Sequence, residues 1–338
     1  VQYMNDPIKK AVVTGAKGFI GSQLCSHLLH SGYFVRALLR SATDSSSTRL
    51  ENLIAPHSAN AELVVADICD AESLTSVFDG IDTVFHLAGV AHVNNVDSEA
   101  MRWLNVEGSR NVLRAAVASR VRRLVFVSSS LAQACELDAG DVTDYGQTKL
   151  EAEQLLLAAH RSQDIEVAIL RAVNVYGIGM KGNISAMISM IARGRLPPLP
   201  RLENRLSLVG VDDLARAAVL AAENMVAGGK IYYVTDGESY LINGIEQAIY
   251  QALGRKLPGW KSPRVLLYVA SALAGLLGKM TGRGSSIGTR TYYNLVRNNC
   301  FSNQEISSDL GFVPASNLYD ELPVIVAQIV AQLHGQAK

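Results

Sequence analysis

The sequence predicts an α/β protein built on a doubly wound parallel sheet, with a smaller, mostly helical C-terminal lobe. Short apolar runs alternate with helical stretches, and the runs lack the apolar–polar alternation of half-exposed strands. Strands buried on both faces have this composition, and repeated strand–helix units imply right-handed crossovers. The runs are residues 11–16, 34–40, 62–68, 82–89, 123–130 and 166–172.

The rest of the chain follows a different rhythm. Residues 196–206 are proline-rich and predict a surface loop, 207–224 predict a short strand and an alanine-rich helix, and 230–239 predict another strand. From residue 241 the chain reads as mostly helical. We therefore expect one domain over 8–175, to which 207–240 return, and a second, smaller lobe over 176–206 and 241–338.

Composition and charge exclude several classes of protein. The 338 residues carry 31 basic and 31 acidic side chains, so the net charge of zero gives no footprint for nucleic acid. Charged residues make up 18%, below the roughly 25% of average soluble domains, which indicates a large core. The cysteines are scattered, which predicts a reducing, cytoplasmic setting. They are Cys25, Cys69, Cys135 and Cys300.

No metal site and no membrane span are predicted. His27 and His30 share a helix face, but no third ligand stands nearby. Residues 1–10 lack the apolar core of a signal peptide. The apolar run 265–278 is shorter than the roughly 20 residues that cross a bilayer, so we expect a buried or interfacial helix there.

A glycine-rich turn follows the first predicted strand and opens the first helix, whose end is marked by Gly32. Gly15, Gly18 and Gly21 allow a tight turn and close backbone approach to a pyrophosphate, which the helix N-terminus attracts. This context predicts a Rossmann-type dinucleotide site. The residues between the glycines that we expect to contact the cofactor are Lys17, Phe19 and Ile20.

The end of the second strand bears on the choice of cofactor. An NAD site usually places an acid here for the ribose hydroxyls, whereas this strand ends in Arg40 and no acid comes before Asp44. A guanidinium can pair with a 2′-phosphate. The sequence therefore favours NADP over NAD, and NAD with Arg40 as a surface charge stays open.

Tyr145 and Lys149 lie four residues apart, on one face of a predicted helix. A neighbouring cation lowers the pKa of a phenol, so we expect Tyr145 to exchange a proton with an alcohol or sugar oxygen. The fifth strand ends in Ser128, Ser129 and Ser130, where the nicotinamide should lie. A hydroxyl there can hold the reacting oxygen against the tyrosine.

The chain resembles the extended short-chain dehydrogenase/reductase family, in its NAD-dependent epimerase/dehydratase branch that acts on nucleotide sugars. The resemblance covers nearly the whole chain. The segments that carry it are TGAKGFIG (14–21), ADI (66–68), HLAG (86–89), LNVEGSRNVL (104–113), VFVSSS (125–130), YGQTK (145–149), LRAVNVYGIG (170–179), SLVGVDDLA (207–215) and ISSDLGFVP (306–314).

The resemblance implies further site residues. It places Asp67 and Ile68 beside the adenine, and Leu87, Ala88 and Gly89 along the dinucleotide. It implies that Asn105 braces the helix that bears Tyr145. Among the serines, Ser130 matches the family's catalytic hydroxyl, which also contacts substrate, and Ser128 is expected to face the nicotinamide. Asn174 matches a position near the substrate diphosphate, and Arg205 matches the arginine that pairs with it.

Departures from the family pattern narrow the chemistry. Dehydratases carry an Asp-Glu pair directly after the catalytic hydroxyl, where this chain has Leu131 and Ala132. Fucose-type epimerase-reductases use a cysteine where Ala132 stands, and Cys135 is too far along. The segment 130–145 is short for the family. A second diphosphate-binding arginine has only two candidates, Arg290 and Arg297.

Two enzyme functions remain, both at C4 of a nucleotide-diphosphate sugar, with a UDP-sugar favoured. One is reduction of a 4-keto sugar by NADPH in bacterial surface-polysaccharide synthesis, and the other is 4-epimerisation with tightly held NAD. A steroid-type dehydrogenase is a weaker alternative, and a non-catalytic dinucleotide-sensing regulator is an alternative of another class. The helices expected at 98–118 and 145–160 resemble those that pair in family homodimers.

Overall fold

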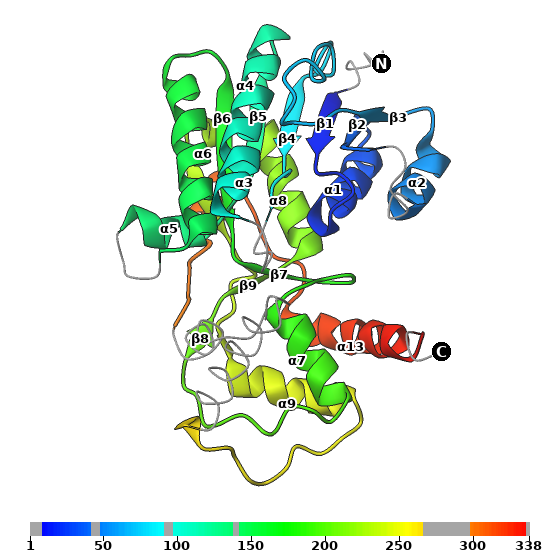
Figure 1. Ribbon diagram of the computed structural model, residues 1–338, viewed down its shortest axis with the longest axis vertical. Helices are drawn as coiled ribbons and strands as arrows, with labels where there is room; N and C mark the ends of the chain where they lie inside the picture. The colour runs from blue at the N-terminus through cyan, green and yellow to red at the C-terminus, as the bar shows by residue number, and fades with distance from the viewer. Residues whose placement is uncertain (1–8, 42–47, 91–96, 138–141, 266–297, 336–338) are drawn as a thin grey trace, which may run out of the picture. The chain divides into compact units, whose positions relative to one another are not determined.

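A computed structural model describes residues 9–41, 48–90, 97–137, 142–265 and 298–335. The chain forms two compact units, whose elements are labelled in Figure 1. Unit 1 comprises residues 1–172, 211–234 and 303–313. Unit 2 comprises residues 173–210, 235–302 and 314–338.

The centre of unit 1 is a seven-stranded sheet of order β10-β6-β5-β4-β1-β2-β3, in which every neighbouring pair is parallel. This is the predicted doubly wound α/β fold, and the prediction is confirmed. The strands are β1 (Lys10–Thr14), β2 (Phe34–Leu39), β3 (Ala61–Val65), β4 (Thr83–His86), β5 (Arg123–Ser129), β6 (Glu166–Ala172) and β10 (Ile231–Val234).

Helices cover both faces of this sheet. On one face α1 (Phe19–His30) packs against α8 (Val211–Glu223), and on the other α4 (Gly108–Ala118) packs against α6 (Asp144–Arg161). The π-helical segment η2 (Trp103–Glu107) leads into α4. The remaining helices of unit 1 are α2 (Thr48–Ile54), η1 (Ala55–His57), α3 (Ser98–Arg102), α5 (Leu131–Glu136), η3 (Met225–Ala227) and α12 (Gln304–Leu310).

The apolar runs form strands because each is enclosed on both faces. Every residue of β4 is buried, as is every residue of β5 except Ser129 at its end. Phe78, Val84 and Phe126 belong to one core cluster that also contains side chains of α4 and α6. Because all strands are parallel, the carboxyl ends of β1, β4 and β5 meet at one edge of the sheet, where α/β proteins bind their ligands.

Unit 2 contains two small sheets and three described helices. Strand β7 (Asn174–Tyr176) pairs with β9 (Leu208–Gly210) in parallel, and β8 (Arg205–Leu206) pairs with β11 (Tyr240–Leu241) in antiparallel orientation. The proline-rich segment is held by α9, because Glu246 Oε1 accepts from the Leu199 N–H at 2.6 Å. The helices are α7 (Asn183–Ala192), α9 (Ile242–Ala252) and α13 (Leu318–Gly335).

The units differ from the expected domain ranges in four places, since residues 173–175, 207–210 and 235–240 fall in unit 2 and residues 303–313 fall in unit 1. The short strand predicted after residue 207 pairs with β7, so residues 207–210 belong to unit 2 rather than to the main sheet. Residues 303–313 belong to unit 1, because α12 is bonded to the β10 region. Asp309 on α12 accepts hydrogen bonds from Nζ of Lys230, just before β10, at 2.5 Å and from the hydroxyl of Tyr232, on β10, at 2.9 Å.

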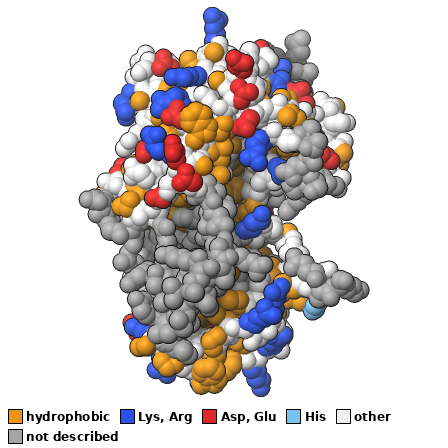
Figure 2. All heavy atoms as spheres, viewed as in Figure 1, with side chains coloured by type: hydrophobic (Ala, Val, Ile, Leu, Met, Phe, Trp, Pro, Cys, Tyr) orange, Lys and Arg blue, Asp and Glu red, His pale blue; other side chains and the backbone are white. Residues whose placement is uncertain are grey.

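The surface of unit 1 carries both signs of charge. On the face drawn in Figure 2, acidic and basic side chains lie interspersed over unit 1, in keeping with the net charge of zero. Of the helices in the described part of the chain, none has the length and apolar character to cross a membrane. The apolar run predicted at 265–278 lies outside the described residues except for Val265.

Candidate active site

The glycine turn between β1 and α1 is built by backbone packed on backbone. Gly15 has a φ of +71°, and a Cβ there would lie 2.8 Å from the Ala88 nitrogen. A Cβ on Gly21 would lie 2.1 Å from the Gly15 carbonyl oxygen. The Gly18 N–H donates to that same oxygen at 2.9 Å, which closes the turn. Any side chain at Gly15 or Gly21 would therefore displace main chain.

The N-terminus of α1 fits an anionic group. No acidic residue occupies its first turn, and Lys17, Phe19 and Ile20 are partly exposed beside the exposed Gly18. A helix N-terminus carries a partial positive charge and N–H groups that lack helical partners. The turn thus has the shape and the polarity that a dinucleotide pyrophosphate requires.

Replacing Gly21 by Ala should weaken cofactor binding about a hundredfold, the equivalent of roughly 3 kcal/mol for the main chain that the new Cβ displaces. The cause is the contact of the new methyl group with the Gly15 carbonyl. Gly32→Ala is the control, because a Cβ at Gly32 meets nothing within 4 Å, and its φ of +79° gives that variant a local strain that Gly21 lacks. Titration of cofactor fluorescence should show normal affinity in that control, and equal losses in both variants would contradict the argument.

The loops after β2, β3 and β4 surround this turn. Arg40 is exposed at the end of β2. The Asp67 carboxylate accepts from the Cys69 N–H at 2.9 Å, and the Ile68 carbonyl accepts from Asn111 Nδ2 at 3.0 Å, so both loop residues are fixed. After β4, the backbone N–H groups of Leu87 and Ala88 donate to Thr14 Oγ1 at 3.2 and 3.1 Å.

Tyr145 and Lys149 lie in the first two turns of α6. Thr143 caps this helix, since its Oγ1 accepts from the Gly146 N–H at 2.7 Å. Lys149 is buried, and its Nζ lies 4.2 Å from the centre of the Phe126 ring on β5. Burial lowers the pKa of Lys149 to about 8, and the charge of Glu153 one turn later opposes that shift.

The electrostatics of Tyr145 differ from the expectation. Its side chain is partly exposed, yet desolvation by surrounding protein raises the pKa of the phenol to about 12, opposed only by a hydrogen bond with Ser129. The prediction that the neighbouring cation lowers this pKa is therefore wrong. Burial outweighs the attraction that a cation at i+4 was expected to supply.

The three serines at the end of β5 have separate surroundings. The Ser128 hydroxyl, which we expected to face the nicotinamide, donates to the buried carboxylate of Glu153. Ser130 is buried at the start of α5, and its N–H donates to the Ala172 carbonyl at 2.9 Å. Ser129, which the family pattern does not select, bonds to Tyr145. Its place in the serine run was the only signal for it in the sequence.

Asn105 connects the loop after β4 with α6. Its Oδ1 accepts from the Val90 N–H at 2.8 Å, and its Nδ2 donates to Thr148 Oγ1 at 2.9 Å. Thr148 in turn donates to the carbonyl of Tyr145 at 2.9 Å. A Cβ on Gly89 would lie 2.9 Å from Asn105 Oδ1, so this loop is closely packed on the asparagine.

The two residues expected at the substrate diphosphate both belong to unit 2. Asn174 is exposed on β7, and Arg205 is exposed on β8, where its Nη1 donates to the Ser239 carbonyl at 3.1 Å. Arg290 and Arg297 lie outside the described residues. Within the described part of the chain, no cluster of three or more His, Cys, Asp or Glu residues has the arrangement of a metal site.

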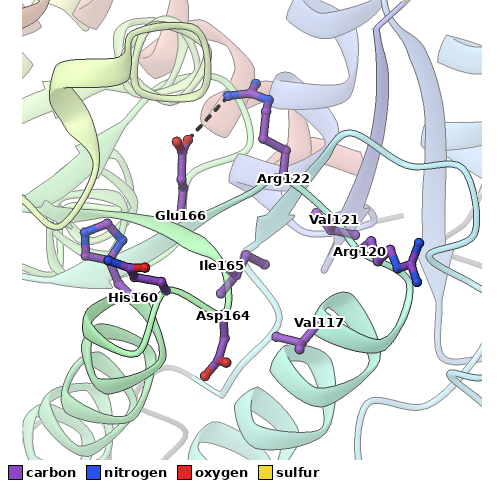
Figure 3. Close-up of a pocket in the computed structure, with 9 residues that line it drawn as sticks. Val117, Arg120, Val121, Arg122, His160, Asp164, Ile165 and Glu166 are labelled. Carbon is purple, nitrogen blue, oxygen red and sulfur yellow. Dashed lines mark hydrogen bonds and ion pairs between the residues drawn. The ribbon is translucent and has the colours of Figure 1, made fainter.

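A cavity of about 450 Å³ lies at the opposite edge of the sheet (Figure 3). Val117, His160 and Glu166 line it near the amino ends of β5 and β6. Figure 3 shows the Arg122–Glu166 ion pair at its rim, whose Nη1 and Oε2 atoms lie 3.5 Å apart. Because the serines and Tyr145 lie at the carboxyl edge, this cavity is not part of the candidate active site.

The glycine turn and the Tyr145–Lys149 pair together define an enzyme of the short-chain dehydrogenase/reductase class. The model of the NAD dependent epimerase/dehydratase family matches residues 11–235, and the chain belongs to this family. Its members include nucleotide-sugar epimerases and related reductases.

Three relatives show the range of similarity. The chain is 28% identical to a UDP-glucose 4-epimerase of Vibrio cholerae over 80% of this chain and 83% of that protein. It is 27% identical to a 3-beta-hydroxysteroid dehydrogenase of Mycolicibacterium neoaurum over 92% of this chain and 90% of that protein. The crystal structure of gox2253 superposes with a TM-score of 0.76 at 26% identity, covering 97% of this chain and 99% of that one.

Proposed function

We propose that the protein transfers hydride at C4 of a nucleotide-diphosphate sugar, with reduction of a 4-keto sugar as the net reaction. The observation that carries this proposal is the Tyr145–Lys149 pair, which lies with Ser129 at the same sheet edge as the glycine turn. That combination suits proton transfer to a carbonyl oxygen beside a bound dinucleotide.

When bound, a nicotinamide cofactor supplies the hydride. Tyr145 holds its proton at neutral pH, because burial raises the pKa of its phenol to about 12, so it can donate to the oxygen of a ketone. Lys149 stabilises the phenolate that this donation leaves. A serine hydroxyl donates the hydrogen bond that positions the substrate oxygen. The two candidates are Ser130, at the family's catalytic position, and Ser129, which bonds to Tyr145.

The expected cofactor is NADP, and NAD is the alternative. Arg40 supports NADP, because it is exposed at the end of β2 and no carboxylate stands beside it in the sequence. Asp67, Ile68, Leu87, Ala88 and Gly89 are proposed to line the dinucleotide. Ser128 remains a proposed neighbour of the nicotinamide only if its bond to Glu153 opens when the cofactor binds.

For the substrate, a UDP-sugar is favoured. The support is the identity with the Vibrio cholerae UDP-glucose 4-epimerase, together with two exposed side chains of unit 2. Asn174 and the guanidinium of Arg205 are proposed to bind the diphosphate. We further propose a role in bacterial surface-polysaccharide synthesis in the cytoplasm, and a homodimer formed through the helices of 98–118 and 145–160.

Two other reactions have specific support. The identity with a UDP-glucose 4-epimerase favours 4-epimerisation, in which the hydride is returned to the same sugar. The identity with a hydroxysteroid dehydrogenase favours oxidation of a steroid alcohol. Arg205 argues against the second, because a steroid carries no anionic group for an exposed guanidinium to bind.

The deciding experiment identifies the cofactor and counts its consumption. Mass spectrometry of the denatured protein's supernatant and titration with NADPH and NADH should show preference for NADPH, which Arg40→Ala should reduce roughly tenfold or more. With a panel of 4-keto nucleotide sugars, one NADPH should be consumed for each sugar reduced. Dialysis-resistant NAD with no net consumption would identify an epimerase, and turnover only with steroids would overturn the proposal.

A further inference from the structure

His86 is a fully buried polar side chain at the carboxyl end of β4. Its ring stacks on Phe126, with ring centres 5.4 Å apart. Each ring nitrogen has a hydroxyl partner, Nδ1 at 2.7 Å from Thr14 Oγ1 and Nε2 at 2.9 Å from Ser109 Oγ. The histidine therefore lies between the strand that enters the glycine turn and the helix that follows Asn105.

The donors and acceptors around this ring determine which nitrogen carries the proton. Thr14 Oγ1 already accepts from the N–H groups of Leu87 and Ala88, so its own hydrogen is available to His86 Nδ1. Ser109 donates its hydrogen to the Asn105 carbonyl at 2.6 Å, so its oxygen accepts from His86 Nε2. This accounting requires the neutral ring with hydrogen on Nε2.

We propose that His86, as the neutral Nε2–H tautomer, is a positioning residue that fixes the cofactor-binding turn and the catalytic helix α6 through one continuous hydrogen-bond chain. The chain runs from Thr14 through His86 and Ser109 to Asn105, and from the Asn105 side chain to Thr148 on α6. Its catalytic half rests on the function proposed above, and its cofactor half does not.

The neutral state is consistent with the surroundings of the ring. Burial, and secondarily the charge of Lys149, lower the pKa of His86 to about 3. A proton on Nδ1 would turn that nitrogen from acceptor to donor, opposite the hydroxyl that Leu87 and Ala88 require as an acceptor. The buried cation would also face Lys149. The hydrogen-bond chain from Thr14 to Thr148 therefore persists throughout the pH range in which a nicotinamide enzyme is assayed.

The two halves of the chain have different consequences. The Thr14 half holds Leu87 and Ala88 against the glycine turn, where a Cβ on Gly15 would already lie 2.8 Å from the Ala88 nitrogen. Losing it should weaken cofactor binding. The Ser109 half holds the main chain of Asn105, and so Thr148 and the start of α6. Losing it should misplace Tyr145 and lower kcat.

Two substitutions of His86 separate the halves. His86→Asn offers an amide oxygen near the position of Nδ1, so it can accept from Thr14 but cannot reach Ser109. His86→Gln offers an amide N–H near the position of Nε2, so it can donate to Ser109 but leaves Thr14 without its acceptor. Ser109→Ala and Thr14→Val break the hydrogen-bond chain at either end without changing the ring. Ser109→Ala removes the bond to His86 together with the donor to the Asn105 carbonyl. Thr14→Val removes the bond to His86 together with the acceptor of the Leu87 and Ala88 N–H groups.

For each variant, the cofactor Kd is measured by fluorescence titration. The kcat is measured with the 4-keto nucleotide sugar of the panel that the wild-type protein reduces. His86→Asn and Ser109→Ala should lower kcat about tenfold and leave Kd within about threefold. His86→Gln and Thr14→Val should raise Kd about tenfold with a smaller change in kcat at saturating cofactor. A residue that only fills the core would change both quantities in the same way in all four variants, and that result would overturn the proposal.

Nitrogen-15 NMR of the wild-type ring needs no variant. It should show the neutral Nε2–H tautomer down to about pH 4. A neutral Nδ1–H tautomer, or protonation near pH 6, would overturn the inference even if every variant failed to fold. The failure of the proposed function can be told apart from the failure of this inference. If no sugar is reduced, the proposed function fails. If the Nε2–H tautomer and the loss of cofactor affinity in His86→Gln are nevertheless observed, the positioning role of His86 in cofactor binding stands.

Discussion

Replacing Tyr145 by Phe should lower kcat by about 10²- to 10⁴-fold and leave cofactor Kd within about threefold of the wild-type value. The substitution removes only the hydroxyl that bonds to Ser129 and that donates the proton in the proposed reaction. The ring keeps its place in the first turn of α6, which Thr143 caps independently. Stopped-flow kinetics with NADPH and fluorescence titration measure the two quantities.

Tyr319→Phe serves as the matched control, because that tyrosine is exposed on α13. It should retain full activity. A Tyr145→Phe variant that still reduces the sugar at more than about one tenth of the wild-type rate would show that the proton comes from another group. If the wild-type protein has no measurable activity and Tyr145→Phe still binds the dinucleotide and the protein's partner normally, the dinucleotide-sensing regulator is favoured instead.

The sheet was predictable because burial on both faces leaves a local trace in the sequence. Strands β1, β4, β5 and β6 coincide closely with apolar runs that show no alternation. The glycine turn was predictable for a related reason, since a Cβ at Gly15 or Gly21 would contact main chain at any such turn. These features depend on a few residues and their near neighbours along the chain.

The long-range polar contacts were not predictable, because their partners come from distant parts of the chain. His86 bonds to residues 72 positions before it and 23 after it. No local pattern distinguishes it from a histidine that only packs within an apolar strand. Asp309 bonds to residues of the β10 region that precede it by 77 and 79 positions, and these contacts group residues 303–313 with unit 1 although no local pattern indicates it.

The serine run shows where resemblance and geometry diverge. The family pattern selects Ser130 by its position, while the structure gives the bond with Tyr145 to Ser129 and the bond with Glu153 to Ser128. At the end of a strand the backbone leaves its regular pleat, so the direction of each side chain depends on the following helix α5. Ser129→Ala and Ser130→Ala, compared by kcat, decide between the two hydroxyls.

Glu153→Gln should lower the free energy of unfolding by about 3–5 kcal/mol, the effect expected when one partner of a buried ion pair is removed. Glu153 and Arg171 are almost fully buried, and Arg171 Nη2 lies 2.6 Å from Glu153 Oε2. The neutral amide leaves the guanidinium with the carboxylate of Glu136, 2.8 Å from Nη1, as its remaining anionic partner. Urea unfolding with an unchanged m-value measures the loss.

Glu151→Gln is the control on the same helix, because Glu151 pairs with Arg102 at a more exposed position. That change should cost less than about 1 kcal/mol. Equal losses in the two variants would mean that the buried pair contributes no more than a surface pair. Replacing Glu153 and Arg171 together by methionine should recover part of the stability, because the buried carboxylate and guanidinium are then both absent and only Lys149 loses the favourable charge of Glu153.

Glu153→Gln should also change the pH dependence of the reaction. Burial holds the pKa of Lys149 at about 8, and the charge of Glu153 is what raises it against that burial. Without that carboxylate nothing in the described part of the chain opposes the burial of the ammonium, because Glu136 on α5 pairs with Arg171 and His86 on β4 is neutral. The pKa of Lys149 should therefore fall further. If charged Lys149 is required, kcat/KM declines above about pH 8 in the wild type and at lower pH in Glu153→Gln, whereas coincident profiles would assign that decline to another group.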